Sequence, residues 1–295
     1  MRDAFAGYHP IVNFLYFAFV LAFSMVFTHP ACLAVSLLCA LTYSFYLNRK
    51  KALRFNLMFM LPMLIITALL NPAFNHQGAT ILLYLHSGNP LTLESILYGI
   101  AAAVMLITVI SWFACFNQVM TSDKFIYLFG RIIPALSLIL SMSLRFAPRF
   151  QAQIKVISNA QKCVGRDVSN GNLWQKLKHG VRILSIMVTW ALENAIETAD
   201  SMKGRGYGLP GRTAFSIFRF DRRDAFALLY IFLCAVAVGA GGLSGVYQFR
   251  YFPTIKGEWG GASLAVFAAY FALGAFPIIV NVKEDLVWKS IKSRT

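Results

Sequence analysis

The chain alternates between long apolar stretches and short polar breaks, and six of the stretches predict membrane-spanning helices. A helix that crosses a bilayer needs about 20 mostly apolar residues. The first two stretches are separated only by His29-Pro30, and proline ends a helix because it lacks an N–H and clashes with the preceding turn. The sequence therefore predicts an all-α, polytopic membrane protein with about six transmembrane helices. The predicted spans are residues 11–28, 31–47, 55–70, 95–116, 225–246 and 263–282.

Between residues 117 and 223 the pattern changes to two long amphipathic helices. Apolar residues recur there at the spacing of three and four that is typical of a helix with one apolar face. The first helix ends at Gly165 and the second at Gly204 and Gly206, and glycine ends helices readily because it accepts left-handed backbone angles. The predicted stripe of the second helix is Leu184, Val188, Ala191, Ala195, Ala199 and Met202.

Two sets of residues in these helices are expected to help them pack. Small residues repeated every four positions allow close helix crossing, and Ala191, Ala195 and Ala199 have this spacing. Arg145 and Arg149 lie on a face of the first helix away from its apolar stripe. An acidic line formed by Glu193, Glu197 and Asp200 either pairs with Arg145, Arg149 or Lys155 or is a solvated face, and the sequence leaves both open.

Composition and charge support the membrane interpretation and orient the chain. Apolar residues make up 58% of the sequence and charged residues 13%, about half the share of a soluble domain. The formal net charge is +15, and 16 of the 27 Lys and Arg residues lie in 117–223. Because cytoplasmic loops of membrane proteins gather Lys and Arg, we expect this segment and both termini to be cytoplasmic. The predicted domains are residues 1–116, 117–223 and 224–295.

The sequence argues against several other functions, because it lacks the residue patterns that they need. Nucleic-acid binding would explain a basic chain, but no binding fingerprint accompanies the charge, so no nucleic-acid partner is expected. An intramembrane enzyme needs paired carboxylates, a Ser/His pair or metal ligands at membrane depth, and the spans carry almost no ionisable residues. His76 and His86 are interpreted as surface residues of a polar loop. We therefore expect neither a catalytic centre nor a metal or cofactor site.

Residues 144–208 carry a resemblance to a known family. The second helix runs from Ala191 through an Ala/Glu-rich stretch to Gly204-Arg205-Gly206, and the first contains Leu144-Arg145-Phe146-Ala147-Pro148. In these features the chain resembles the transmembrane T component of energy-coupling factor (ECF) transporters, a group that includes the cobalt-transport Q subunit. Members of that family carry an Ala-Arg-Gly motif at the end of each of two cytoplasmic coupling helices.

This chain departs from the family pattern at both motifs. Gly204 replaces the usual alanine of the second motif, while Arg205 and Gly206 match it. The first motif departs further, because Val164 stands before Gly165 where arginine is expected and Arg166 follows the glycine. Either Arg166 takes the role after a small backbone shift, or this contact has no arginine.

The resemblance implies a non-catalytic subunit of a prokaryotic cell-membrane importer of vitamins or transition metals such as cobalt. Such a T component would hold two ABC ATPases, which bind the ATP, and a membrane-embedded substrate-binding S component. It would pass the motion of the ATPases to the S component through the coupling helices. Arg205 is then the expected main ATPase anchor and Arg166 its partner. A permease subunit of another ABC importer and a stand-alone transporter are the alternatives.

Overall fold

The computed structural model describes residues 3–49, 54, 56–84, 90–130, 133–166, 172–210, 218–245, 249–257 and 260–292. Two compact units are formed: Met1–Phe125 together with Phe218–Thr295, and Ile126–Ile217 between them in sequence. We call them the bundle unit and the helix-pair unit. The predicted division into residues 1–116, 117–223 and 224–295 stays a prediction.

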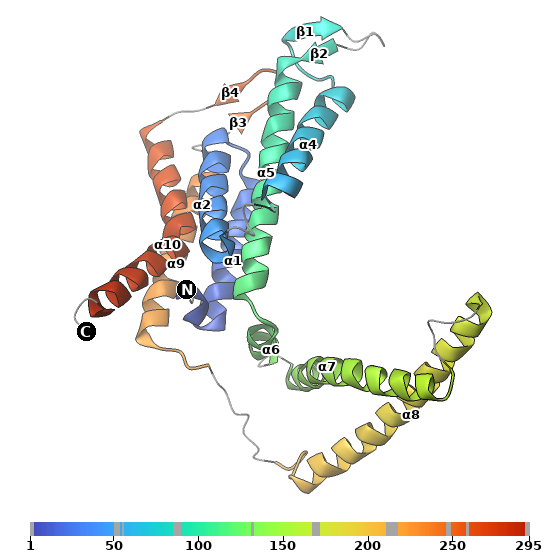
Figure 1. The fold of residues 1–295 in the computed structure, drawn as a ribbon. Helices are drawn as coiled ribbons and strands as arrows, with labels where there is room; N and C mark the ends of the chain where they lie inside the picture. The colour runs from blue at the N-terminus through green and yellow to red at the C-terminus, as the bar shows by residue number, and fades with distance from the viewer. Residues whose placement is uncertain are drawn as a thin grey trace. The chain divides into compact units, whose positions relative to one another are not determined.

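The bundle unit is built from apolar helices (Figure 1). Four of its helices, α2, α5, α9 and α10, are long and apolar enough to cross a membrane, and α1 and the segment Met58–Phe74 are shorter apolar helices. The all-α, polytopic fold is thereby confirmed, whereas the number of six spans stays a prediction. The helices are α1 (Pro10–Val26), α2 (Pro30–Asn48), α4 (Leu61–Phe74), α5 (Leu93–Val119), α9 (Arg222–Leu243) and α10 (Gly261–Lys292), with a π-helical turn η2 (Asn56–Met60) before α4 and a 3-10 turn η1 (Phe5–Gly7) before α1.

Two His-Pro pairs begin the first two helices in the same way. The backbone N–H of Ile11 donates to Nδ1 of His9 at 3.3 Å, and that of Ala31 donates to Nδ1 of His29 at 3.1 Å. In both helices the proline follows the capping histidine, at the position where its missing N–H costs no hydrogen bond. The polar break at His29-Pro30 is therefore a helix start as well as a helix end.

Short hairpins connect other helices of the bundle unit. Strand β1 (Ile81–Tyr84) pairs antiparallel with β2 (Pro90–Thr92), and β3 (Phe249–Arg250) pairs with β4 (Lys256–Gly257). Within the first hairpin connection, the carboxylate of Glu94 accepts hydrogen bonds from the backbone N–H and the hydroxyl of Thr80, the latter at 2.8 Å. These bonds fix the polar connection between α4 and α5.

Aromatic side chains fill the core of the bundle unit. Trp112 of α5, Tyr16 of α1 and Tyr43 of α2 are fully buried around Phe5. Each polar atom on these rings has a partner, for example the Tyr16 hydroxyl, which donates to the carbonyl oxygen of Gly274 at 3.1 Å. Satisfying these groups matters because an unpaired polar atom in an apolar core costs about 1–3 kcal/mol.

An N-terminal segment, residues 3–9, binds four helices of the bundle unit. Asp3 accepts hydrogen bonds from the Tyr43 hydroxyl at 2.9 Å and from Nδ2 of Asn281 at 2.7 Å. Nζ of Lys124, in α6 (Ser122–Gly130), donates to the carbonyl oxygen of Ala6 at 2.5 Å. Burial lowers the pKa of Lys124, and the carboxylate of Asp3 opposes that shift.

The same segment also contacts the start of α9. The backbone N–H of His9 donates to Oδ1 of Asp224 at 3.0 Å, and the guanidinium of Arg223 lies 4.3 Å from the centre of the Tyr8 ring. The N-terminal segment therefore contacts the two places, in α6 and at the start of α9, where the chain leaves the bundle unit and returns to it.

The helix-pair unit contains α7 (Pro134–Cys163) and α8 (Leu173–Gly204), which cross in Figure 1. Asn172 caps α8 in a capping box with Gln175, whose side chain accepts from the Asn172 N–H at 3.3 Å. Where the helices cross, Ile157 packs with Ile183 and Met187 in a small buried cluster. The predicted pair of long amphipathic helices is therefore present.

Candidate functional site

The two long helices of the helix-pair unit end in the same hydrogen-bond pattern. At the end of α7 the N–H of Gly165 donates to the carbonyl oxygen of Lys162, and the N–H of Arg166 to that of Gln161, both at 2.9 Å. At the end of α8 the N–H of Gly206 donates to Lys203 at 2.9 Å and the N–H of Tyr207 to Met202 at 3.0 Å. This pair of bonds is a Schellman motif, which satisfies carbonyl groups that the helix itself leaves free.

The glycine is required at both ends. Gly165 has φ +75° and Gly206 has φ +77°, in the left-handed region where a Cβ is unfavourable. Gly204, by contrast, is the last helical residue of α8, and a Cβ added there meets nothing within 4 Å. The substitution of glycine for the family's alanine at position 204 is therefore compatible with the same helix end.

The shared motif aligns the two ends residue by residue. Val164 has φ −92° and ψ 11°, and Arg205 has φ −88° and ψ 12°, so both occupy the position just before the left-handed glycine. Val164 is 65% exposed, and Arg205 is also exposed. Arg166 instead corresponds to Tyr207 of the α8 end, because each is the residue that follows the left-handed glycine. The backbone of the first end is not shifted to bring Arg166 into the place of Arg205.

A groove of about 650 Å³ lies between α7 and α8 and includes Arg205. Arg145 and Arg149 line it from α7, and Glu197 lines it from α8. Beside the groove, the guanidinium of Arg149 lies 5.7 Å from the centre of the Trp190 ring, which holds the side chain over an aromatic face. Three arginines and one glutamate give this groove a positive charge, which suits a ligand or partner that presents carboxylates.

Part of this groove was not predicted from the sequence. Asn194, Thr198 and Ser201 line it from α8, at the spacing of three and four residues that places side chains on one helix face. That spacing places the three side chains on one face of α8, but it does not show that this face meets the arginines of α7. Glu197, one of the three residues of the predicted acidic line, lies in the same groove as Arg145 and Arg149; its pairing with an arginine stays a prediction.

The predicted stripe of α8 differs from the face that packs on α7. Ile183 and Met187 are buried against α7, whereas Leu184 is 62% and Val188 50% exposed. The face of α8 that contacts α7 is thus one residue earlier than the predicted stripe, because α8 has two neighbouring apolar faces and periodicity alone does not say which one meets α7. Of the alanine ladder, Ala191 is half-buried and Ala195 and Ala199 are exposed, so their packing role remains a prediction for another partner.

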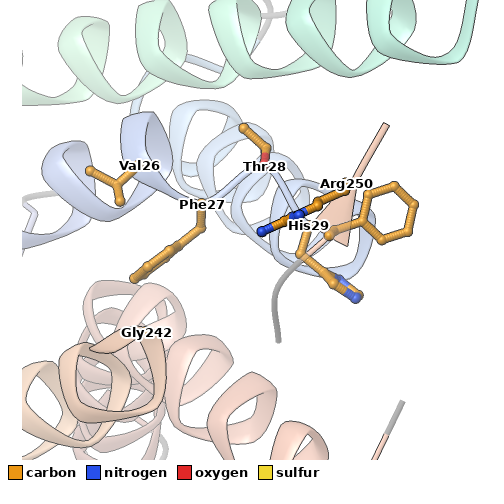
Figure 2. A pocket seen from close by; sticks show the side chains of 7 residues that line it. Val26, Phe27, Thr28, His29, Gly242 and Arg250 are labelled. Atoms are coloured by element: carbon orange, nitrogen blue, oxygen red, sulfur yellow. The ribbon is translucent and has the colours of Figure 1, made fainter. Parts of the chain in front are cut away.

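A second hollow, of about 320 Å³, lies at the turn between α1 and α2 in the bundle unit (Figure 2). Figure 2 shows Thr28 and His29 on this turn, with Arg250 beside them and Gly242 across the hollow. His29 caps α2, and the carbonyl oxygen of Thr28 accepts from the Tyr251 hydroxyl at 2.9 Å. These contacts serve the turn, and Arg250 is the charged side chain among the lining residues. Since a ligand site usually gathers several convergent polar groups, we assign this hollow a structural role.

Within the described residues, no group of three or more His, Cys, Asp and Glu side chains is placed to hold a metal ion. His76 lies in the connection after α4, and His86 lies outside the described residues. The candidate site is therefore the pair of helix ends and the arginine-lined groove.

Together, these features define a polytopic membrane protein that carries a pair of long amphipathic helices with matching, exposed ends. Residues 9–215 match the family described as CbiQ, cobalt transport protein. The chain belongs to this family.

Curated relatives named energy-coupling factor transporter transmembrane protein EcfT are similar over part of the chain. The protein of Lacticaseibacillus paracasei is 38% identical over 93 residues, that of Lactococcus lactis subsp. cremoris 35% over 102, and that of Bacillus selenitireducens 36% over 106. The matches cover 31, 34 and 36% of this chain and 35, 38 and 40% of the respective relatives. The aligned parts therefore span well under half the length of these relatives.

Proposed function

We propose that this chain is the transmembrane T component of an ECF-type importer. In this function it holds two ATP-hydrolysing subunits on the cytoplasmic side and a substrate-binding S component in the membrane. The observation that carries the proposal is the pair of matching helix ends, one of which presents Arg205 next to a groove with Arg145 and Arg149. Membership of the family and the names of the relatives support it.

The geometry of the helix ends suits attachment to another protein. A Schellman end uses its backbone N–H groups internally, so the side chain of Arg205 is left to make the contact. A guanidinium offers a planar fork of donors that pairs with a carboxylate in two places at once. Because Arg205 sits on the last turn of a 32-residue helix, a force applied to it is passed along α8.

Energy coupling then follows from the contact between α7 and α8. Ile157, Ile183 and Met187 join the helices where they cross, so the two ends move together rather than independently. When the ATPases close on ATP, the ends are drawn with them, and the rigid helix pair transmits the displacement. The chain supplies no catalytic group to this process.

Two ATPases of similar structure would meet unequal ends. The end of α8 offers Arg205, whereas the corresponding position in α7 is Val164. We propose that the α8 end is the stronger anchor and that Arg166, displaced to the far side of Gly165, gives the α7 end a weaker, different contact.

Substitution of Arg205 tests this proposal. Arg205→Glu, co-expressed with the two proposed ATPase partners, is expected to lose most of the ATPase during purification, because an attractive charge becomes repulsive. Lys203→Glu is the matched control, since it changes the same charge on the same exposed helix end. Equal ATPase retention and transport by wild type, R205E and K203E would refute the assignment.

The exposed apolar stripe of α8 is the proposed surface for the S component. Leu184 and Val188, followed by Ala195 and Ala199, form a continuous exposed face that the contact with α7 leaves uncovered. Leu184→Gln is expected to weaken co-purification of the S component while leaving ATPase retention intact. Loss of both partners together would indicate that the variant disturbs the helix pair instead.

The proposed substrate class is vitamins or transition metal ions, with cobalt suggested by the family description. The S component selects the substrate in this mechanism, so the chain's own residues do not name it. Mass spectrometry of the small membrane protein that co-purifies with the chain identifies the S component, and uptake assays with that complex test the substrate.

A further inference from the structure

A groove of about 690 Å³ lies on the bundle unit between α9 and the C-terminal half of α10. Its walls are largely apolar and include Phe226 of α9 and Ile279, Val287 and Trp288 of α10. All four side chains are about half exposed or more. The groove therefore presents a large apolar surface that the described residues of the bundle unit leave exposed.

The shape of α10 creates this groove. Pro277 lies inside the helix, and a proline within a helix removes one backbone hydrogen bond and bends it. Figure 1 shows that α10 is bent, with its C-terminal part turning away from the bundle toward the C-terminus. Beyond residue 282, where the last predicted span ends, the helix continues to Lys292 and is amphipathic rather than purely apolar.

Two cations are among the residues that line the groove. Arg223 is held in place because its guanidinium lies 4.3 Å from the centre of the Tyr8 ring and its Nη2 donates to the carbonyl oxygen of Gly7 at 3.3 Å. A guanidinium carries five N–H donors, so this anchoring leaves others for a ligand. Lys283 lines the same groove from α10 and is exposed.

The acidic residues nearby do not cancel both cations. Asp224 is buried and accepts hydrogen bonds from the backbone N–H groups of His9 and Asp221, both at 3.0 Å. Asp285 accepts from the Tyr46 hydroxyl at 2.7 Å. Glu284 is the carboxylate among the lining residues. The charged side chains that line the groove are therefore two cations and one carboxylate, a net charge of +1 beside an apolar floor.

We propose that this groove binds one anionic phospholipid of the cytoplasmic leaflet, in the orientation inferred from the basic segment. Its acyl chain lies along Phe226 and Ile279, and its phosphate is held between Arg223 and Lys283. A phosphate suits a fixed guanidinium, which can donate two parallel N–H bonds to it. Trp288 lies where tryptophan is enriched, at the boundary between acyl chains and headgroups.

Native mass spectrometry of the purified, delipidated full-length chain tests the site. We expect wild type to retain phosphatidylglycerol in preference to phosphatidylcholine of the same chain length. Lys283→Gln is expected to weaken phosphatidylglycerol binding about tenfold, as for the loss of one charge-assisted hydrogen bond. Lys289→Gln is the matched control, because it removes the same charge from the same helix outside the groove. Equal binding by K283Q and K289Q, or no preference between the two lipids, overturns the proposal.

Further variants separate the parts of the site. Arg223→Gln also removes the contact with Tyr8, so Ile279→Trp is used to fill the apolar floor without changing either cation. I279W is expected to lower the binding of both lipids. Displacement of phosphatidylglycerol by excess inorganic phosphate would show an anion site without acyl recognition and would overturn the proposal.

A protein occupant is the remaining outcome. In the purified assembly with its partners, a photoreactive cross-linker on Val287→Cys is expected to label lipid. Labelling of a partner protein instead, with unchanged lipid retention in K283Q, would make the groove a protein interface and overturn the lipid site. None of these measurements depends on ATPase coupling, so failure here and failure of the proposed function are distinguishable.

Discussion

Val164 and Arg205 occupy the same position in two helix ends whose backbone angles differ there by only a few degrees. Each precedes a glycine with φ near +76°, and each end is closed by the same two backbone hydrogen bonds. The difference between the ends is therefore one of side chain rather than of backbone. A valine in place of an arginine makes the α7 end the weaker anchor of the two in the proposed function.

An arginine at position 164 is expected to give the α7 end the same ATPase contact as the α8 end. Val164 is 65% exposed and follows a complete helix, so Val164→Arg leaves the fold unchanged. The added charge-assisted contact is expected to tighten ATPase association about tenfold, measured by surface plasmon resonance on the detergent-solubilised chain. Val164→Gln is the control for size and polarity. Equal affinity of V164R and V164Q would show that the α7 end makes no carboxylate contact.

Alanine substitutions of the two glycines at the end of α8 are expected to change the stability of its last turn in opposite directions. Gly204→Ala should stabilise the last turn by about 0.5–1 kcal/mol, because the residue is helical and a Cβ there meets nothing. Gly206→Ala should destabilise it by about 1–2 kcal/mol, because φ +77° disfavours a side chain. Hydrogen exchange at the amides of Gly206 and Tyr207 measures both changes. Faster exchange in G204A than in wild type would contradict the assigned helix end.

The contact between α7 and α8 depends on a few side chains. Met187 is 6% exposed and packs with Ile157 and Ile183, so Met187→Ala is expected to destabilise the helix pair by about 2 kcal/mol. Leu184→Ala, at a residue that is 62% exposed, is expected to stay within about 0.5 kcal/mol of wild type. Limited proteolysis of the helix pair compares the stability of the two variants. Similar protection of both variants would show that α7 does not pack on the face of α8 that carries Met187.

Asp3 is expected to contribute strongly to the stability of the bundle unit. Asp3→Ala leaves the Tyr43 hydroxyl and Nδ2 of Asn281 without their acceptor, which costs about 1–3 kcal/mol. Asp285→Ala is a matched comparison that removes a single bond, from the Tyr46 hydroxyl. Thermal unfolding in detergent should therefore show a larger drop for D3A than for D285A. The reverse order would argue against the N-terminal segment as a structural element of the bundle.

Periodicity predicted the helices well and their contact faces less well. The apolar stretches and the His-Pro breaks located α1, α2, α5 and α9 because long apolar runs and proline act locally. The last turns of α10 lie beyond the predicted span of residues 263–282, because they are amphipathic rather than continuously apolar. The face of α8 that contacts α7 did not follow from the predicted stripe, because α8 has two adjacent apolar faces.

The candidate site was predicted in part. The glycine ends and Arg205 are local features of the sequence, and glycine at 165 and 206 reports a left-handed backbone directly. The groove was not predictable, because the meeting of Arg145 and Arg149 with Asn194 and Thr198 depends on how two helices cross. The equivalence of Val164 and Arg205 likewise needed the hydrogen bonds of both ends.

The N-terminal segment also has a consequence for how the protein is made. Ala4 donates its backbone N–H to Oδ1 of Asn281, 277 residues further along the chain, at 2.7 Å. Contacts between residues so distant in sequence form late, because a long loop must close before they are made. Residues 3–9 are synthesised well before their partners on α9 and α10. The bundle therefore stays open on this side until α10 has been made and inserted.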